Sequence, residues 1–148
     1  MVAESPSPEI PDLDAAILPG ASAAGIPIGE KIDKLQNLVP SIQAVDGTFG
    51  LYTFPSVKIW SREGIILQIG VSEGYRGLLD GKIGIGSTIA EVEEWSNCKV
   101  IEGQYDELVV AGKDGWSFET TEWNGNHKVS MNRYARITSI FVTSSPTR

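Results

Sequence analysis

The stretch Gly25-Ile-Pro-Ile-Gly-Glu-Lys-Ile-Asp-Lys-Leu35 is repeated, without gaps, by Lys82-Ile-Gly-Ile-Gly-Ser-Thr-Ile-Ala-Glu-Val92. In each copy two isoleucines, two positions apart, precede a glycine, and apolar residues then recur three positions apart. A short apolar entry that changes to helical spacing is typical of a chain that turns into an amphipathic helix. This pair of blocks therefore predicts a fold built from two copies of one unit.

Each block predicts a short helix with one apolar face. The apolar spacing continues to Leu38 in the first copy and to Trp95 in the second. Thr88 and Glu91 stand three residues apart, which is the spacing of a capping box at the start of a helix. Helices this short are marginal on their own, so we expect both to be stabilised by packing on a sheet.

The segments after the two predicted helices also correspond. Val57–Trp60 resembles Trp116–Glu119, with apolar residues at alternate positions. Three further apolar residues have the same spacing in both copies: Ile66, Ile69 and Val71 in the first, and Ile137, Ile140 and Val142 in the second. Between these matches the second copy has an additional segment, Trp123–Ala135, whose Asn124-Gly125 pair favours a hairpin turn. Chance similarity of short apolar blocks is the alternative, and two matches in the same order argue against it.

The predicted fold class is α+β. We expect two tandem helix-plus-three-strand units, at about 25–71 and 82–142, that form one antiparallel sheet with the helices on one face. The second unit adds the extra hairpin. Residues 1–22 are rich in proline and poor in large apolar groups, so they predict a disordered or extended arm before a single domain over 23–148. The glycine-rich segment 70–81 is expected to link the units and to let another backbone come close.

If the sequence is the full gene product, its composition and cysteine content predict a small cytoplasmic protein. The chain has 148 residues, of which 41% are hydrophobic and 21% charged, and no apolar run has the length of a membrane span. The first residues have neither the basic start nor the apolar run of a secretory signal. Cys98 is the single cysteine, so no disulfide forms within the chain, and we expect it to be a small packing residue.

The sequence contains no catalytic or metal-binding motif of standard spacing. His127 is the only histidine, and it falls in the predicted extra hairpin without an obvious orienting partner. The glycines match neither the dinucleotide-binding nor the P-loop pattern. We therefore expect no enzyme activity, no cofactor and no metal, and the alternative is a pair of carboxylates that meet only in space.

Acidic residues are concentrated in the second copy. The net charge is -7, and the segment Glu91–Glu122 holds nine acids against two lysines. Such a surface repels nucleic acid and attracts a basic protein. Acidity that merely keeps a small domain soluble is the alternative.

Two tryptophans are candidate anchors for a protein partner, because aromatic residues concentrate binding energy at interfaces. Trp60 alternates out of phase with its apolar neighbours, and Trp123 lies at the mouth of a turn. Together with the acids, the predicted partner-binding residues are Trp60, Glu91, Glu94, Glu102, Asp106, Glu107, Glu119, Glu122 and Trp123.

The block Lys82–Val92, a glycine-led short helix followed by strands, resembles the repeat unit of β-lactamase-inhibitor-protein-like and SmpA/OmlA-like bacterial domains. The resemblance covers roughly 25–142, and the tandem arrangement is similar to the inhibitor in particular. It implies a non-enzymatic protein that presents a concave sheet to another protein. The cysteine pairs of a secreted inhibitor and the lipoprotein signal of the envelope adaptors are both missing from this sequence.

The leading functional hypothesis is an inhibitor or immunity protein that neutralises a toxin or enzyme by covering its surface. The first alternative is a structural or adaptor module of an envelope or secretion-system assembly, which binds without inhibiting. The second alternative is a small enzyme or ligand-binding domain, which a buried polar pocket would favour.

Overall fold

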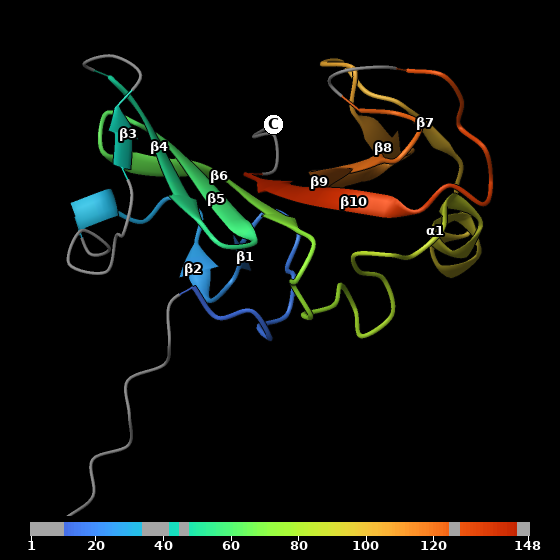
Figure 1. Cartoon of the computed structure of the whole chain (residues 1–148), viewed down its shortest axis with the longest axis horizontal. Helices are drawn as coiled ribbons and strands as arrows, with labels where there is room; N and C mark the ends of the chain where they lie inside the picture. Colours follow the sequence, from blue (N-terminus) through green and yellow to red (C-terminus); the bar gives the residue numbers. More distant parts are fainter. Residues whose placement is uncertain (1–10, 34–41, 45–47, 125–127, 145–148) are drawn as a thin grey trace, which may run out of the picture.

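The computed structural model describes residues 11–33, 42–44, 48–124 and 128–144 (Figure 1). The first half of the described chain contains β1 (Ser22–Ala23), β2 (Ile26–Pro27), β3 (Ile42–Ala44), β4 (Phe49–Phe54), β5 (Val57–Arg62) and β6 (Ile65–Ser72). The second half contains α1 (Ile89–Ser96), β7 (Val100–Glu102), β8 (Leu108–Val110), β9 (Lys113–Thr120) and β10 (Ile137–Thr143). The described residues therefore form ten strands and one α-helix.

Eight of the strands form one antiparallel sheet in the order β3-β4-β5-β6-β10-β9-β8-β7. Each half contributes a four-stranded meander, and the last strands of the two meanders, β6 and β10, lie side by side at the centre (Figure 1). Ile69 pairs with Val142, and Val71 pairs with Ile140. Because Ile69 and Val71 correspond in sequence to Ile140 and Val142, the central strand pair is two-fold symmetric.

The two strand pairs that flank the centre share one register and one irregularity. In each half the third strand of the meander pairs with the fourth in the same way. Between β5 and β6, Val57 pairs with Val71 and Ile59 with Ile69. Between β9 and β10, Trp116 pairs with Val142 and Phe118 with Ile140. The register shifts after Trp60 in β5 and after the equivalent Glu119 in β9. The next residue is a buried hydroxyl in both halves, Ser61 and Thr120. Since such irregularities bend a strand, both halves curve at the same place.

The two glycine-led blocks dock on the last strand of their own half through equivalent backbone hydrogen bonds. In the first half these are Gly29 N–H to Ile66 O (2.8 Å), Ile66 N–H to Glu30 O (2.9 Å) and Ile32 N–H to Gly64 O (2.8 Å). In the second half they are Gly86 N–H to Ile137 O (2.9 Å), Ile137 N–H to Ser87 O (2.8 Å) and Ile89 N–H to Ala135 O (3.2 Å). The repeated sequence block therefore has the same docking position in both halves.

The predicted fold class is wrong, because among the described residues only the second block continues into an α-helix and the main sheet has eight strands. Thr88 caps α1 by accepting a hydrogen bond from Glu91 N–H, and the Glu91 side chain accepts one from Thr88 N–H, which confirms the predicted capping box. The equivalent cap position of the first block is Lys31, whose side chain has no acceptor. Residues 32–33 form a 3-10 turn, and 34–41 lie outside the described residues. The protein is mostly β, with four strands rather than three in each half.

The hydrophobic core lies on one face of the sheet. A layer made of β1, β2, α1 and the connection between β6 and α1 covers this face (Figure 1). The largest fully buried side chains come from both layers and both halves: Ile17, Ile26, Ile59, Ile66, Ile69, Ile83, Ile89, Leu108, Phe118, Ile137 and Ile140. Burial of each such side chain stabilises the fold by about 1.5–3 kcal/mol, so this single core supplies the main stabilising energy.

Residues 11–22 are not a disordered arm; residues 1–10 lie outside the described part. Ile17 is fully buried and donates its N–H to Leu78 O (3.0 Å). The Tyr75 hydroxyl donates to Ala15 O (2.5 Å) and accepts from Ala24 N–H (2.8 Å). We call residues 11–24 the strap, because they hold the connection between the halves against the core. Disorder, one of the two alternatives predicted for residues 1–22, does not hold for residues 11–22, because apolar residues such as Ile17 dock on the core.

The predicted linker, 70–81, overlaps β6 over its first three residues, 70–72, and the rest of it connects β6 to the block that precedes α1. Gly77 passes so close to the strap that a Cβ at this position would overlap the carbonyl group of Ala15. A residue with a side chain would therefore push the strap away. The close backbone approach expected of these glycines is found at this position.

The predicted extra hairpin Trp123–Ala135 is a loop over most of its described length. Trp123 and Lys128 form a single antiparallel bridge, and residues 125–127, which include part of the predicted turn, lie outside the described residues. From residue 129 to residue 135 the chain forms no strand before it enters β10. The predicted turn Asn124-Gly125 is not flanked by the alternating apolar residues that a pair of strands needs.

Candidate functional site

The face of the sheet opposite the core, which we call the open face, carries two hollows. The larger has a volume of about 580 Å³ and is lined by residues of β6, β10, β9, β8 and β7. Gln68 of β6 lies at one end of this lining and Ile101 of β7 at the other. The smaller, of about 220 Å³, is lined by Lys58, Trp60 and residues of β6, β9 and β10. Both hollows are lined by Glu119 and Phe141, so they adjoin each other across the strands, and we call the two together the groove.

An aromatic pair lies in the middle of this groove. Trp60 of β5 and Phe141 of β10 make an edge-to-face contact, with ring centroids 6.0 Å apart. The intervening strand places Gly70 between them, and a Cβ on Gly70 would come within 3.0 Å of both rings. The glycine therefore lets two large side chains from strands that are not neighbours meet over the sheet.

The side chains on the open face differ between the two halves, although the neighbouring side chains on the core face are similar. Trp60 in β5 and Glu119 in β9 occupy equivalent positions. Two residues earlier in each strand, Lys58 and Ser117 are also equivalent. The core residues between them, Ile59 and Phe118, are both fully buried and apolar. The repeated scaffold thus carries unlike side chains on its open face.

Charge is unevenly placed along the groove. Lys58 is exposed at the end that the first half provides, and Glu119 lies at the centre, next to the aromatic pair. The far end is lined by Glu107, Asp114 and Lys113. Among these lining groups the acids outnumber the bases toward the second half, as the distribution of charge in the sequence predicts.

The β7–β8 connection brings together several of the predicted site residues. Trp123 Nε1–H donates to Asp106 O (2.8 Å), and the Lys128 ammonium lies 2.7 Å from the Asp106 carboxylate. Lys128 and the neighbouring Glu102 hold the pKa of Asp106 below its usual value. Because Asp106 is already paired, it contributes less to a field that attracts a basic partner than the sequence count implies.

Glu107 and Trp123 have structural contacts as well. The Glu107 carboxylate accepts a hydrogen bond from Tyr105 N–H (2.8 Å) and so shapes the turn that forms the far wall of the groove. Trp123 packs on the edge of the core and is half-buried. The structure therefore places Glu107 both in the turn and in the groove lining, whereas Trp123 supports the turn from behind.

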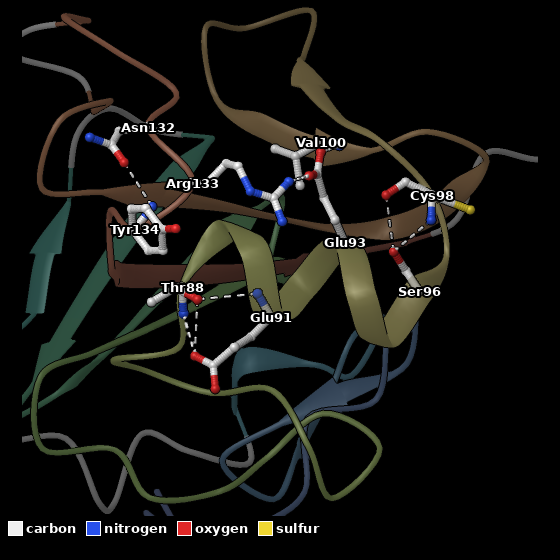
Figure 2. Close-up of polar contacts among 9 residues, drawn as sticks. All are labelled: Thr88, Glu91, Glu93, Ser96, Cys98, Val100, Asn132, Arg133 and Tyr134. Atoms are coloured by element: carbon white, nitrogen blue, oxygen red, sulfur yellow. Dashed lines mark hydrogen bonds and ion pairs between the residues drawn. The ribbon is translucent and has the colours of Figure 1, made fainter.

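The predicted acids of α1 lie away from the groove, on the layer that covers the core. Glu91 belongs to the capping box, where hydrogen bonds from the Thr88 backbone and side chain lower its pKa (Figure 2). Its neighbour Glu93, which lacked a predicted role, pairs with Arg133 (3.1 Å) and accepts from Val100 N–H (Figure 2). Glu94 is exposed on the same helix. The acids of α1 therefore do not join Trp60 and Glu119.

Glu122 is the remaining predicted site residue. It lies in the loop after β9, half-buried, and its backbone carbonyl accepts hydrogen bonds from Val129 and Ser130 N–H. Of the nine predicted residues, three line the groove: Trp60, Glu107 and Glu119.

Phe141 and Gly70 are the groove residues that sequence reasoning missed. Phe141 stands between Ile140 and Val142, so it is out of phase with the core residues of its strand, as Trp60 is in β5. The alternation that singled out Trp60 would also have found Phe141. The role of Gly70 has no comparable signal, because it depends on two side chains from other strands.

Within the described ranges, no three His, Cys, Asp or Glu side chains are grouped so that they could hold a metal ion, and His127 lies outside these ranges. The described α-helix, with eight residues, falls short of the length and apolar character needed to cross a membrane. Comparisons with models of known protein families, with curated proteins and with solved structures find no match to this chain.

Proposed function

We propose that this chain is a non-catalytic inhibitor, of the kind that immunity proteins exemplify, and that it covers a basic partner protein with the open face of its sheet. The observation that carries the proposal is the divergence of Trp60 and Glu119 at equivalent positions of a repeated scaffold. A face that only contacts water has no need of an aromatic pair over a glycine. Half-buried aromatic residues in a shallow groove are typical anchors of protein interfaces.

The partner is a protein rather than a small molecule because the groove is open and wide. Small-molecule sites are usually concave and enclose most of the ligand surface. The two hollows instead extend across the sheet and share side chains, which suits a surface that meets another surface. The net charge of -7 would attract a basic partner over long range. A chain with a single cysteine forms no internal disulfide, which is compatible with binding to the partner in the cytoplasm.

The test compares capture by the wild-type chain with capture by a variant that lacks the aromatic pair. The double variant Trp60→Ala, Phe141→Ala should lose a partner that the wild type captures from the source cells. Tyr134→Ala is the matched control, because Tyr134 is an aromatic residue that is 77% exposed on the loop before β10. The proposed binding face is wrong if the control loses the partner while the double variant keeps it.

A second measurement separates inhibition from simple attachment. The activity of the captured partner is measured with increasing amounts of the purified chain. Loss of activity at a one-to-one ratio supports the inhibitor. Full activity in the complex would contradict inhibition and favour the alternative, an adaptor module of an envelope or secretion-system assembly.

A further inference from the structure

We infer that the first-half end of the open face binds an acidic, extended segment of the partner, with carboxylates at Lys58 and Arg62 and a large apolar side chain on Trp60; this inference rests on the proposed function. These three residues, which we call the basic row, occupy alternate positions of β5, so their side chains lie on one face of the sheet. Lys58 and Arg62 are exposed and Trp60 is half-buried, whereas the residues that alternate with them are buried on the core side.

The strands around the basic row contain no acidic residue. β4, β5 and β6 hold two bases, Lys58 and Arg62, and no Asp or Glu, in a chain whose net charge is -7. Glu63 and Glu73 lie in the turns at the two ends of β6, and Glu119 of β9 is three strands from β5, which is about 14 Å. Among the described residues, none of the ion pairs involves Lys58 or Arg62. This part of the face therefore presents positive charge to a ligand.

The second half has no counterpart of the basic row. The equivalent positions, in β9 and directly after it, carry Ser117, Glu119 and Thr121. The core residues between these positions are buried in both halves. Because the same scaffold folds without two cations and a tryptophan at these positions, the fold does not require them, and they are available for binding.

Arg62 is positioned for binding by an aromatic ring. Its guanidinium carbon lies 4.4 Å from the centroid of the Phe49 ring, and Phe49 is the residue directly opposite in β4. The ring attracts the cation and covers one face of the guanidinium group. The N–H donors lie in the plane of that group, so they still reach a carboxylate. A side chain that is restricted before binding loses less entropy when the ligand arrives.

The spacing of the basic row predicts the sequence of the bound segment. Lys58 and Arg62 are four residues apart, which is about 13 Å along a strand. Two acids four residues apart in an extended segment have the same separation, and the residue midway between them points to the same side. That residue meets Trp60, which with Phe141 lines the smaller hollow of about 220 Å³. The expected pattern is acid, any residue, large apolar residue, any residue, acid.

A protein segment fits the basic row better than a nucleic acid does. A nucleic acid strand carries a phosphate at every nucleotide, and the net charge of -7 repels it beyond the two cations. A protein segment can match two cations with two acids. A partner that is basic overall can carry such a segment, because net charge acts over long range whereas the contact depends on local groups.

The experiment uses the full chain and a phage-displayed library of random peptides. Peptides enriched on the wild type should contain two acids with a large apolar residue between them. Calorimetry with the synthetic peptides should show an affinity about tenfold lower for Lys58→Gln, Arg62→Gln, which is about 1.4 kcal/mol shared by two exposed ion pairs. Lys82→Gln, Lys99→Gln is the matched control, because it removes the same charge from exposed positions outside β4, β5 and β6. It should change the affinity less than about twofold.

A charge reversal tests whether the basic row itself selects the segment. The variant Lys58→Glu, Arg62→Glu should reject the enriched peptides and bind versions in which lysine replaces each acid. A purely structural role of the two residues would not transfer specificity in this way. Continued binding of the acidic peptides, or failure of the folded variant to bind the lysine versions, contradicts the inference. Melting curves of each variant confirm that it is folded.

The other results that would overturn the inference identify a different ligand or none. Enriched peptides without acids, equal binding to wild type and Lys58→Gln, Arg62→Gln, or no enrichment over blank beads each contradict an acidic segment. Binding of a single-stranded thymidine oligonucleotide that this variant loses would indicate a nucleic acid, and a dimer in sedimentation that it dissociates would indicate a second copy. Partner capture that needs Trp60 and Phe141 but neither cation would leave the proposed function standing without the inference.

Discussion

The two halves of the sheet repeat each other on the core face and differ on the open face. On the core face, equivalent positions carry buried apolar residues, as Ile59 and Phe118 do. On the open face they carry residues of different chemistry, as Trp60 and Glu119 do. A close-packed core tolerates only side chains that fill it, whereas the opposite face is free of this restriction. The comparison separates what the fold requires from what it leaves available for binding.

The largest expected effect tests whether the two core positions are equivalent. Phe118→Ala should lower the free energy of unfolding by about 3–5 kcal/mol, and Ile59→Ala by about 2–5 kcal/mol, because each removes a fully buried side chain at the same register position. Chemical denaturation measures both. If either substitution leaves the midpoint unchanged, the two halves do not share one core.

The next prediction concerns α1, the helix of the second half. Trp95 is half-buried, packs against Trp116 with ring centroids 6.2 Å apart, and donates its indole N–H to the Asp80 carboxylate (2.9 Å). Trp95→Ala should cost about 2 kcal/mol, which is less than for a fully buried tryptophan. A thermal melt is sufficient to detect this change. An effect as large as that of Phe118→Ala would show that α1 is as central to the core as the strands.

A smaller effect is expected at the strap, which contacts the connection between the halves. Tyr75→Phe removes one hydroxyl that donates to Ala15 O and accepts from Ala24 N–H. The loss should be about 1–2 kcal/mol, because two backbone groups are left with weaker partners. Hydrogen exchange of the Ala24 amide should accelerate more than exchange within β6. Uniform acceleration throughout the sheet would contradict a local role for the strap.

The smallest expected effect is the pH dependence that the capping box of α1 contributes to stability. The Thr88 hydrogen bonds lower the pKa of Glu91 below its ordinary value of 4.5. A carboxyl group whose pKa is lower in the folded state stabilises the fold above that ordinary value, and this stability is lost as the pH falls through the folded-state pKa. Melting temperatures measured downward from pH 7 should therefore fall less steeply for Glu91→Gln than for the wild type. Parallel curves would mean that the capping box does not titrate with folding.

The correspondence between strands of the two halves was the part of the fold that the sequence predicted best. The matched segments Val57–Trp60 and Trp116–Glu119 occupy equivalent places in the sheet, because alternation and spacing are direct consequences of strand geometry. The helix of the second block was predicted correctly, because Thr88 caps it. The first block has lysine at the equivalent cap position, and its residues from 34 to 41 lie outside the described part of the chain.

The candidate site was predicted only in part, because it depends on contacts between distant segments. Trp60 could be identified from its phase, and Glu107 and Glu119 from the acidic segment, but counting acids could not separate them from Glu91 and Asp106. Those two are occupied by a helix cap and by Lys128. Which acids line the groove is decided by the three-dimensional arrangement and cannot be read from the charge count.

The central strand pair has a consequence for what the groove can recognise. Equivalent strands that pair about a two-fold axis are characteristic of an isologous interface between identical subunits. In such a homodimer every side chain appears twice, and a groove across the axis has two identical ends. In this protein both strands belong to one polypeptide. Lys58 can therefore stand in β5 while Ser117 occupies the equivalent position in β9, so that a ligand with unlike ends is held in a single orientation.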